Sequence, residues 1–149
     1  MWFDKRNPAV VYLDTREESY IQCDGRTFTV APDVVGDFTA LPYDDGAFRL
    51  VVFDPPHLKR AGINSYMREH YGRLPEDWKP FVAAGFAECL RVLAHHGVLV
   101  FKWSEAQVPL REVLDAIGYE PLFGNRGSRD KTHWLCFMKG ASLPLRRKA

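Results

Sequence analysis

The strongest strand signal in the chain leads directly into a diproline, in the run Phe48-Arg49-Leu50-Val51-Val52-Phe53-Asp54-Pro55-Pro56-His57. Its first six residues are apolar except for Arg49, and large or branched apolar side chains of this kind favour strands. Proline cannot donate to a sheet ladder, and it holds the residue before it in extended geometry. We therefore predict a strand over 48–53 that ends at Asp54.

Outward from this strand, short apolar runs alternate with helical stretches. Further strands are expected over 9–13, 33–36, 98–101, 119–123 and 133–138, a hairpin over 20–30, and helices over 81–95 and 108–117. Asp24-Gly25 is typical of a hairpin turn, and Gly97 and Gly118 are helix stops. Continuous apolar runs indicate strands covered on both faces. The expected fold is therefore an open, mostly parallel α/β sheet.

Charged residues follow the predicted strands where each one ends. Asp14, Asp37, Asp54 and Lys102 each come after an apolar run. Ligands of open α/β sheets bind at the carboxyl ends of the strands. Taken singly, Asp14 and Asp37 are also ordinary turn residues. Together with Asp54 they indicate a ligand site along one edge of the sheet.

The diproline run resembles a known catalytic motif. Asp54-Pro55-Pro56-His57 is similar to motif IV of S-adenosylmethionine-dependent methyltransferases that methylate exocyclic amino nitrogens, which carry Asp/Asn/Ser-Pro-Pro before an aromatic residue. The resemblance implies that Asp54 and Pro55 engage the target amino group, that Pro56 stiffens the turn, and that His57 stacks on or orients the ring. Histidine replaces the usual Tyr, Phe or Trp, which leaves the identity of the substrate open.

The flanking residues extend the resemblance to class I methyltransferases over residues 9–139. The run from Gly36 to Val52 looks like the passage between motifs III and IV, which implies that Asp37, with Phe38 beside it, accepts from the cofactor adenine. Asp14 would bind the ribose hydroxyls of S-adenosyl-L-methionine. The resemblance implies a Rossmann-like sheet with a reversed C-terminal strand.

The beginning of the chain resembles small phage- and prophage-type enzymes of the DNA-methylase kind. In those enzymes a Gly-rich turn directly precedes a Trp-Phe-Asp-Lys segment, and Trp2-Phe3-Asp4-Lys5 looks like its end. Phe3 and Asp4 are therefore expected near the cofactor. No glycine precedes them, so we expect the first strand and the Gly-rich turn to be missing, or another element to take their place.

Residues 58–80 are expected to form a lid over the substrate within a single domain of residues 1–141, followed by a disordered basic tail over 142–149. The lid contains basic residues interleaved with aromatic ones, a composition that suits phosphate contacts and base stacking. The members are Lys59, Arg60, Arg68, His70, Arg73 and Lys79, with Tyr66, Tyr71 and Trp78. Glu69, Glu76 and Asp77 dilute this charge, so a merely solvated lid is an equal alternative.

Two dipeptides at strand ends are candidates for the substrate pocket. Lys102-Trp103 and His133-Trp134 are expected on neighbouring strands and could line the pocket. The alternative is that the tryptophans cover the edge of the sheet. His95-His96 is expected to compensate a helix dipole, and no His, Cys or Asp spacing indicates a metal site.

Composition limits the function classes. The 149 residues, 46% hydrophobic and 26% charged, are ordinary for one globular domain. A net charge of +1 excludes a globally basic nucleic-acid binder, so nucleic-acid contact would need a local patch. No apolar run approaches the roughly 20 residues of a membrane span. Three widely spaced cysteines, Cys23, Cys89 and Cys136, fit free thiols in a cytoplasmic protein.

We therefore expect an S-adenosylmethionine-dependent methyltransferase that acts on an amino group of a nucleobase, in DNA more than in RNA. A base in a duplex would have to be flipped out. Two alternatives stay open, which are a methyltransferase for a small molecule or a protein side chain, and an inactive Rossmann-like binding remnant. The sequence does not indicate the oligomeric state.

Overall fold

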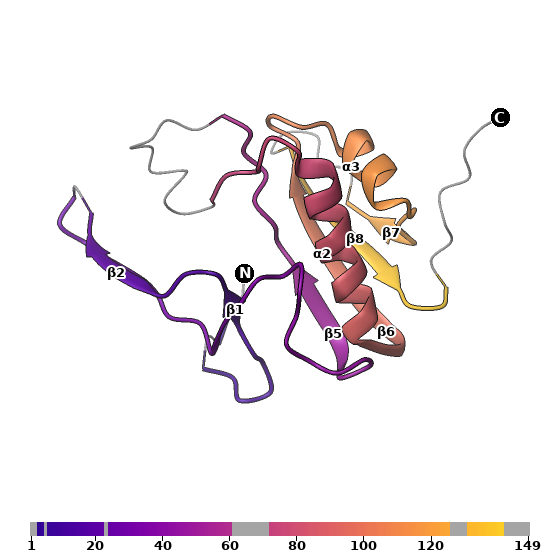
Figure 1. Cartoon of the computed structure of the whole chain (residues 1–149), viewed down its shortest axis with the longest axis horizontal. Coiled ribbons are helices and arrows are strands. Elements are labelled where there is room, and N and C mark those ends of the chain that lie inside the picture. Colours follow the sequence, from indigo (N-terminus) through magenta and orange to yellow (C-terminus); the bar gives the residue numbers. More distant parts are fainter. Residues whose placement is uncertain (1–2, 5, 23, 61–71, 126–130, 142–149) are drawn as a thin grey trace. The chain divides into compact units, whose positions relative to one another are not determined.

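The computed structural model describes residues 3–4, 6–22, 24–60, 72–125 and 131–141, which fall into two compact units over residues 1–42 and 43–149 (Figure 1). The middle of the expected lid, Cys23 and the basic tail lie outside the described residues.

The described residues of the first unit form two strand pairs. Strand β1 (Leu13–Asp14) pairs in parallel with β4 (Val34–Val35), and β2 (Glu18–Ile21) pairs antiparallel with β3 (Thr27–Val30). Gly25 adopts a φ of 81° in the turn between β2 and β3, a value that favours glycine. The predicted hairpin is therefore confirmed, whereas the strand expected over 9–13 is reduced to its last residue and Asp14.

The described residues of the second unit form a four-stranded sheet and two helices. Its elements in chain order are β5 (Phe48–Phe53), α2 (Trp78–Val92), β6 (Leu93–Ser104), α3 (Leu110–Ile117), β7 (Phe123–Gly124) and β8 (Thr132–Met138). The strand order is β5-β6-β8-β7, with β5 and β6 parallel and the other two pairings antiparallel. In Figure 1, β5 and β6 run in the same direction, so their carboxyl ends lie near the beginning of α2.

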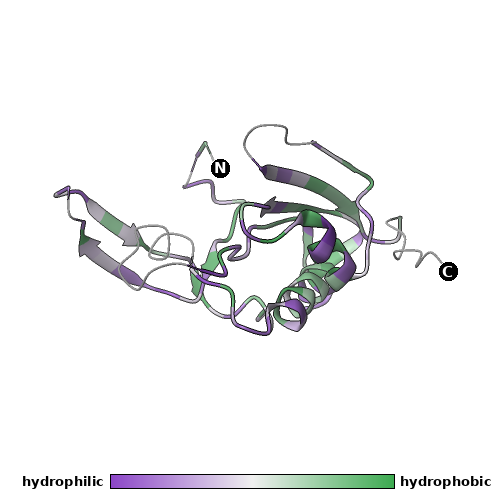
Figure 2. Cartoon of the chain, turned by 90° about the horizontal axis from the view of Figure 1, so that it is seen from above, coloured by the Kyte–Doolittle hydropathy of each residue, from purple (hydrophilic) through white to green (hydrophobic). Residues whose placement is uncertain are grey.

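Burial alternates along the central strands of this sheet. Leu99, Phe101 and Trp103 of β6 are buried, whereas the residues between them are half-buried. Phe86 of α2 contacts the ring of Phe101, which shows that α2 covers the buried face. On β5, Leu50 is 50% exposed. Figure 2 shows hydrophobic residues on the strands and helices of this unit. One face of the sheet therefore carries the core.

The fold class expected from the sequence is wrong. Among the described residues, only β1–β4 and β5–β6 are parallel, and the strands form three separate sheets. The structure is 19% helical and 33% strand, with antiparallel pairs in two of the three sheets, and it is not a Rossmann-like, mostly parallel α/β fold. The physical reason is that apolar runs such as 98–101 are fully buried on one face of the sheet only. The prediction assumed that helices cover both faces.

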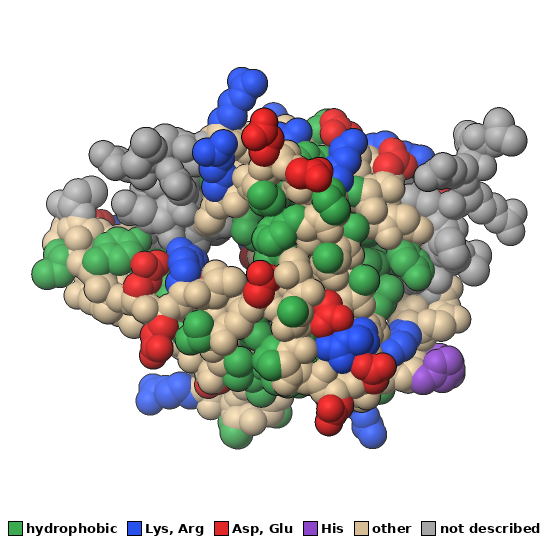
Figure 3. All heavy atoms as spheres, viewed as in Figure 1, with side chains coloured by type: hydrophobic (Ala, Val, Ile, Leu, Met, Phe, Trp, Pro, Cys, Tyr) green, Lys and Arg blue, Asp and Glu red, His purple; other side chains and the backbone are tan. Residues whose placement is uncertain are grey.

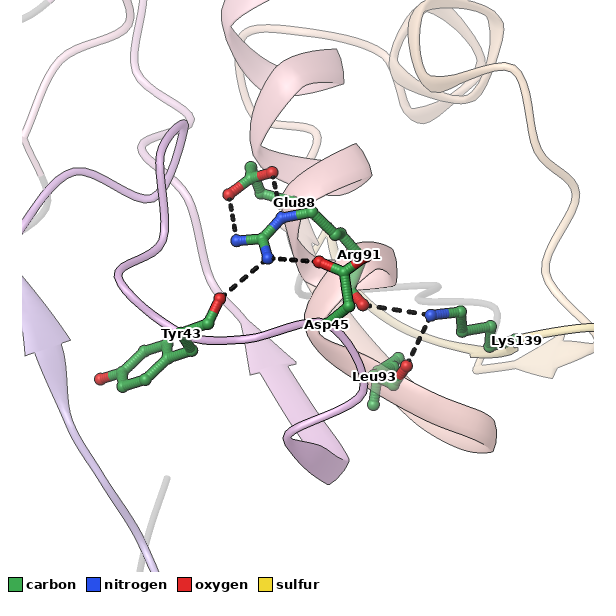
Figure 4. A network of polar contacts seen from close by, with 6 residues as sticks. All are labelled: Tyr43, Asp45, Glu88, Arg91, Leu93 and Lys139. Carbon is green, nitrogen blue, oxygen red and sulfur yellow. Dashed lines mark hydrogen bonds and ion pairs between the residues drawn. The ribbon is translucent and has the colours of Figure 1, made fainter.

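The end of the first predicted helix is also corrected. Helix α2 ends at Val92, where His95 was expected, because Leu93–His96 already belong to β6. Nζ of Lys139 lies 3.1 Å from the carbonyl of Arg91 and 2.6 Å from that of Leu93, so a lysine from beyond β8 satisfies carbonyls at the helix end (Figure 4). Helix α3, in contrast, ends at Gly118 as predicted, with a φ of 76°.

Candidate active site

The candidate site is centred on Asp54 and Lys102, which the sheet register brings together. Phe53 of β5 pairs with Phe101 of β6, so the next residues of the two parallel strands, Asp54 and Lys102, are neighbours. Nζ of Lys102 lies 2.7 Å from Oδ2 of Asp54, with side chains 20% and 29% exposed. The carboxylate is therefore already bound to a nitrogen donor at a partly buried position.

The diproline corner directly follows this ion pair. Pro55 is buried and Pro56 is half-buried, and Gly72 lies against Pro56 with a φ of 68°. His57 is only 8% exposed, and its ring meets Trp103 edge to face at a centroid distance of 6.4 Å. The corner is consequently packed into the unit, and His57 offers little free ring surface for stacking.

Burial keeps the imidazole of His57 uncharged near neutral pH. Desolvation lowers the pKa of His57, the nearby Asp54 raises it, and the positive charge of Lys102 lowers it again. The net direction is downward from an ordinary value of about 6.5. At pH 7 a neutral imidazole therefore lies beside the Asp54–Lys102 pair.

The two predicted pocket dipeptides are divided between opposite faces of the sheet. Lys102 pairs with Trp134 and Trp103 pairs with His133 across β6 and β8. Nζ of Lys102 lies 5.9 Å from the ring centroid of Trp134, which places Trp134 beside Asp54 on the half-buried face. Successive residues of a strand point to opposite faces, so Trp103 and His133 belong to the other face.

Trp103 and His133 are core residues in this structure. Trp103 is completely buried, donates from Nε1 to the carbonyl of Val108 at 3.0 Å, and stacks on Phe101. His133 is 7% exposed, and its Nε2 lies 3.1 Å from Oε1 of Glu105, close enough for an ion pair when the imidazole is protonated. Trp103 therefore contacts the candidate site through the ring of His57.

Sequence reasoning missed Glu105. Its Oε2 accepts from the backbone N–H of Leu110 at 3.3 Å, at the beginning of α3, while Oε1 faces His133. The pKa of Glu105 lies below its ordinary value, chiefly because of its interaction with His133. An acid three residues before the predicted start of a helix at Val108 was the available signal, but its histidine partner comes from a distant strand.

The residues expected to hold the cofactor adenosine lie in the first unit. Asp14 and Asp37 lie at the carboxyl side of the parallel β1–β4 pair. Arg16 occupies both oxygens of Asp14, with Nε 3.1 Å from Oδ1 and Nη2 3.4 Å from Oδ2. Oδ1 of Asp37 accepts from the backbone N–H and the hydroxyl of Thr39, both at 2.8 Å.

The contacts of Asp37 are compatible with its predicted role toward adenine, whereas those of Asp14 conflict with its predicted role toward the ribose. Both bonds from Thr39 go to Oδ1 of Asp37, and Asp37 is exposed. Ribose hydroxyls would have to displace Arg16 from Asp14. Phe38 is half-buried, Phe3 is fully exposed, and Oδ1 of Asp4 accepts from the backbone N–H of Arg6 at 2.9 Å. Within the first unit, the bonds of Asp37 to Thr39 therefore use one carboxylate oxygen, whereas Arg16 binds both oxygens of Asp14.

No group of three potential metal ligands occurs in the described part of the chain. Cys89 is buried, and burial raises the pKa of its thiol to about 12. Burial also raises the pKa of the Cys136 thiol. Of the helices that the structure describes, none has the length and apolar character to span a membrane.

Comparison with protein-family models finds no family that matches this chain, and comparison with curated proteins finds no similar protein.

Proposed function

We propose that this protein transfers a methyl group from S-adenosyl-L-methionine to an exocyclic amino nitrogen of a nucleobase, in DNA in preference to RNA. The observation that carries this proposal is the carboxylate of Asp54, which lies at the end of β5 beside a rigid diproline corner and already accepts from a nitrogen, Nζ of Lys102. The resemblance of the same residues to the methyltransferase motif supports the same chemistry.

The corner supplies what a base amino group needs in order to react. The lone pair of such a nitrogen is delocalised into the ring, so the nitrogen is a poor nucleophile. The carboxylate of Asp54 and the carbonyl of Pro55 would both accept hydrogen bonds from the amino group, which localises the lone pair. The target amino group takes the place of the Lys102 ammonium at the carboxylate. This is catalysis by positioning and electrostatic stabilisation.

The bound donor supplies the electrophilic methyl carbon. The nitrogen forms the new bond to that carbon, the carbon–sulfur bond breaks with its electron pair returning to sulfur, and the nitrogen gives up one proton to solvent. Lys102, once displaced, has Trp134 within reach, and a lysine ammonium is stabilised by an aromatic face.

The test is transfer of a labelled methyl group by the full chain to single-stranded DNA, duplex DNA, RNA and free nucleosides. We expect Asp54→Ala to lower transfer about 5- to 150-fold, because a hydrogen bond to a charged group contributes about 1–3 kcal/mol. Asp115→Asn is the matched control, since Asp115 is an exposed aspartate of α3. Full transfer activity in Asp54→Ala would contradict the proposal.

One observation favours a second candidate, a methyltransferase for a small molecule or a protein side chain. His57 stands where an aromatic stacking residue is usual, and its 8% exposure leaves little surface for a base. The same assay separates the candidates, because label would then appear in pools of metabolites or proteins and stay absent from every nucleic acid.

A further inference from the structure

Four basic side chains lie next to the diproline corner in chain segments that contact one another. Lys59, Arg60, Arg73 and Lys79 are exposed, and none forms an ion pair with another residue that the structure describes. We call them the basic cluster. We infer that the basic cluster binds the phosphate backbone of a nucleic acid. This inference deepens the proposed function and rests on it for the chemistry of the target.

The backbone beneath the basic cluster is fixed by hydrogen bonds between two chain segments. The N–H of Leu74 donates to the carbonyl of Leu58 at 2.9 Å, and Nε of Arg73 donates to the carbonyl of Lys59 at 3.0 Å. The side chain of Gln107 holds Arg60 from both sides, accepting from its N–H at 2.7 Å and donating to its carbonyl at 2.9 Å. Hydrogen bonds therefore fix the backbone that carries these charged side chains.

A tryptophan holds two of these cations together. Nζ of Lys59 and Nζ of Lys79 lie 5.2 and 5.9 Å from the ring centroid of Trp78, which is almost completely buried. Trp78 in turn stacks on Trp103 at 6.4 Å, and Trp103 meets His57. A series of ring contacts therefore leads from the basic cluster through Trp78 and Trp103 to His57 at the diproline corner.

Three other cations of the same unit have acidic partners among the described residues. Arg91 pairs with Asp45 and Glu88, Lys102 with Asp54, and Arg111 with Asp115. Glu76 and Asp77 are exposed near the beginning of α2 and reduce the local charge from +4 to +2. Figure 3 shows acidic and basic side chains interspersed at the upper end of the view. A net positive charge with no ion-pair partner among the described residues suits an external polyanion.

A nucleic-acid backbone fits the basic cluster better than a single phosphate. The four charges come from two chain segments, residues 59–60 and 73–79, and two of them, on Lys59 and Lys79, lie over the Trp78 ring. A nucleobase at Asp54 carries phosphates on both sides of its sugar, and these phosphates continue along the strand. Contacts of this kind position a strand without reading its sequence.

The experiment measures binding of a fluorescent 20-nucleotide DNA to the full chain as a function of salt, without methyl donor. Removing one phosphate contact lowers the slope of log affinity against log salt by about 0.7 for a single strand and about 0.9 for a duplex. We expect Lys79→Gln to lower the slope by about this amount. The triple variant Lys59→Gln, Arg60→Gln, Lys79→Gln, which keeps Arg73 and its bond to Lys59, should lower it by about 2–3.

Arg49→Gln is the matched control, because Arg49 is an exposed cation of β5 outside the basic cluster. An unchanged slope in the triple variant, with an unchanged circular dichroism spectrum, would overturn the inference. Equal competition by polyglutamate would also overturn it, since the cluster would then bind any polyanion.

Binding by Asp54→Asn keeps this inference separate from the proposed function. We expect that variant to bind DNA like the natural protein while its methyl transfer falls at least about 5-fold. If the protein methylates free nucleosides but does not bind DNA, the inference about the basic cluster is wrong and the proposed function stands. If the protein binds DNA, the triple variant loses that binding, and no pool receives a methyl group, the proposed function is wrong and the inference stands.

Discussion

At the scale of single residues, Lys102 and Asp54 show how strand register produces a site. The two residues lie 48 positions apart in sequence, and only the parallel pairing of β5 and β6 makes them neighbours. Proline then prevents the chain from continuing the ladder at Asp54. The sequence predicted both residues as strand-end charges, but the ion pair between them depends on register, which no local pattern reveals.

Removing the lysine tests the strength of that pair. Lys102→Met leaves Asp54 without its cation at a position where only 29% of the side chain is exposed. We expect the free energy of unfolding to fall by about 0.5–1.5 kcal/mol, measured by urea denaturation. Arg111→Gln breaks the exposed Arg111–Asp115 pair of α3 and should cost at most about 0.5 kcal/mol. An equal loss of unfolding free energy in Lys102→Met and Arg111→Gln would contradict the partly buried character of the Asp54–Lys102 pair.

His57 should make stability depend on pH. Its folded pKa lies below the unfolded value of about 6.5, so the unfolded chain binds more protons between the two values. Its full contribution to stability is therefore present above pH 6.5 and is lost as the pH falls toward the folded pKa. His57→Phe should show a smaller fall in the free energy of unfolding between pH 7 and pH 5. The same pH dependence in both proteins would contradict the assignment.

Asp37 is the residue on which we expect cofactor affinity to depend. Asp37→Ala should weaken binding of S-adenosylhomocysteine by about 1–3 kcal/mol in calorimetric titration, because a charge-assisted hydrogen bond is lost. Asp37 also accepts from Thr39, so Thr39→Val is the control that removes the hydroxyl bond and keeps the carboxylate. A loss of the same size in Thr39→Val would indicate that Asp37 only shapes the turn.

At the scale of elements, turn and helix-end residues correctly predicted where individual strands and helices stop. The prolines end β5 at Phe53, Asp24-Gly25 turns the hairpin, and Gly118 ends α3. Helix α2 ends three residues earlier than expected, because Leu93–His96 are drawn into the sheet and Lys139 binds the last carbonyls. That lysine is distant in sequence, so helical periodicity alone could not place the end.

Lys139 should therefore contribute measurably to stability. It donates to the carbonyls of Arg91 and Leu93, next to the Arg91 side chain that joins Asp45 to Glu88 (Figure 4). Lys139→Met leaves two partly buried carbonyls without this donor. We expect the free energy of unfolding to fall by about 1–3 kcal/mol in urea denaturation. Arg49→Gln, an exposed change on β5, should alter it by less than about 0.5 kcal/mol.

At the scale of the whole molecule, the sequence was least informative about strand direction. Apolar runs such as 98–101 and 133–138 predicted strands correctly, but a run of this kind is compatible with parallel and with antiparallel pairing. The structure pairs β6 with β8 antiparallel over seven residue pairs, from Val98↔Met138 to Ser104↔Thr132. The alternating burial along both strands shows that one face carries the core. The expectation of helices on both faces therefore failed, while the position of Asp54 at a strand end did not depend on it.

The most direct test of the central claim is mass spectrometry of nucleosides digested from DNA that the protein has treated with labelled S-adenosyl-L-methionine. We expect the label on the exocyclic amino nitrogen of one base, and Asp54→Asn, which keeps the shape of the side chain and removes its charge, should lower that product at least about 5-fold. Label on a ring carbon, or equal product from Asp54→Asn, would contradict the role of the Asp54 corner in methyl transfer.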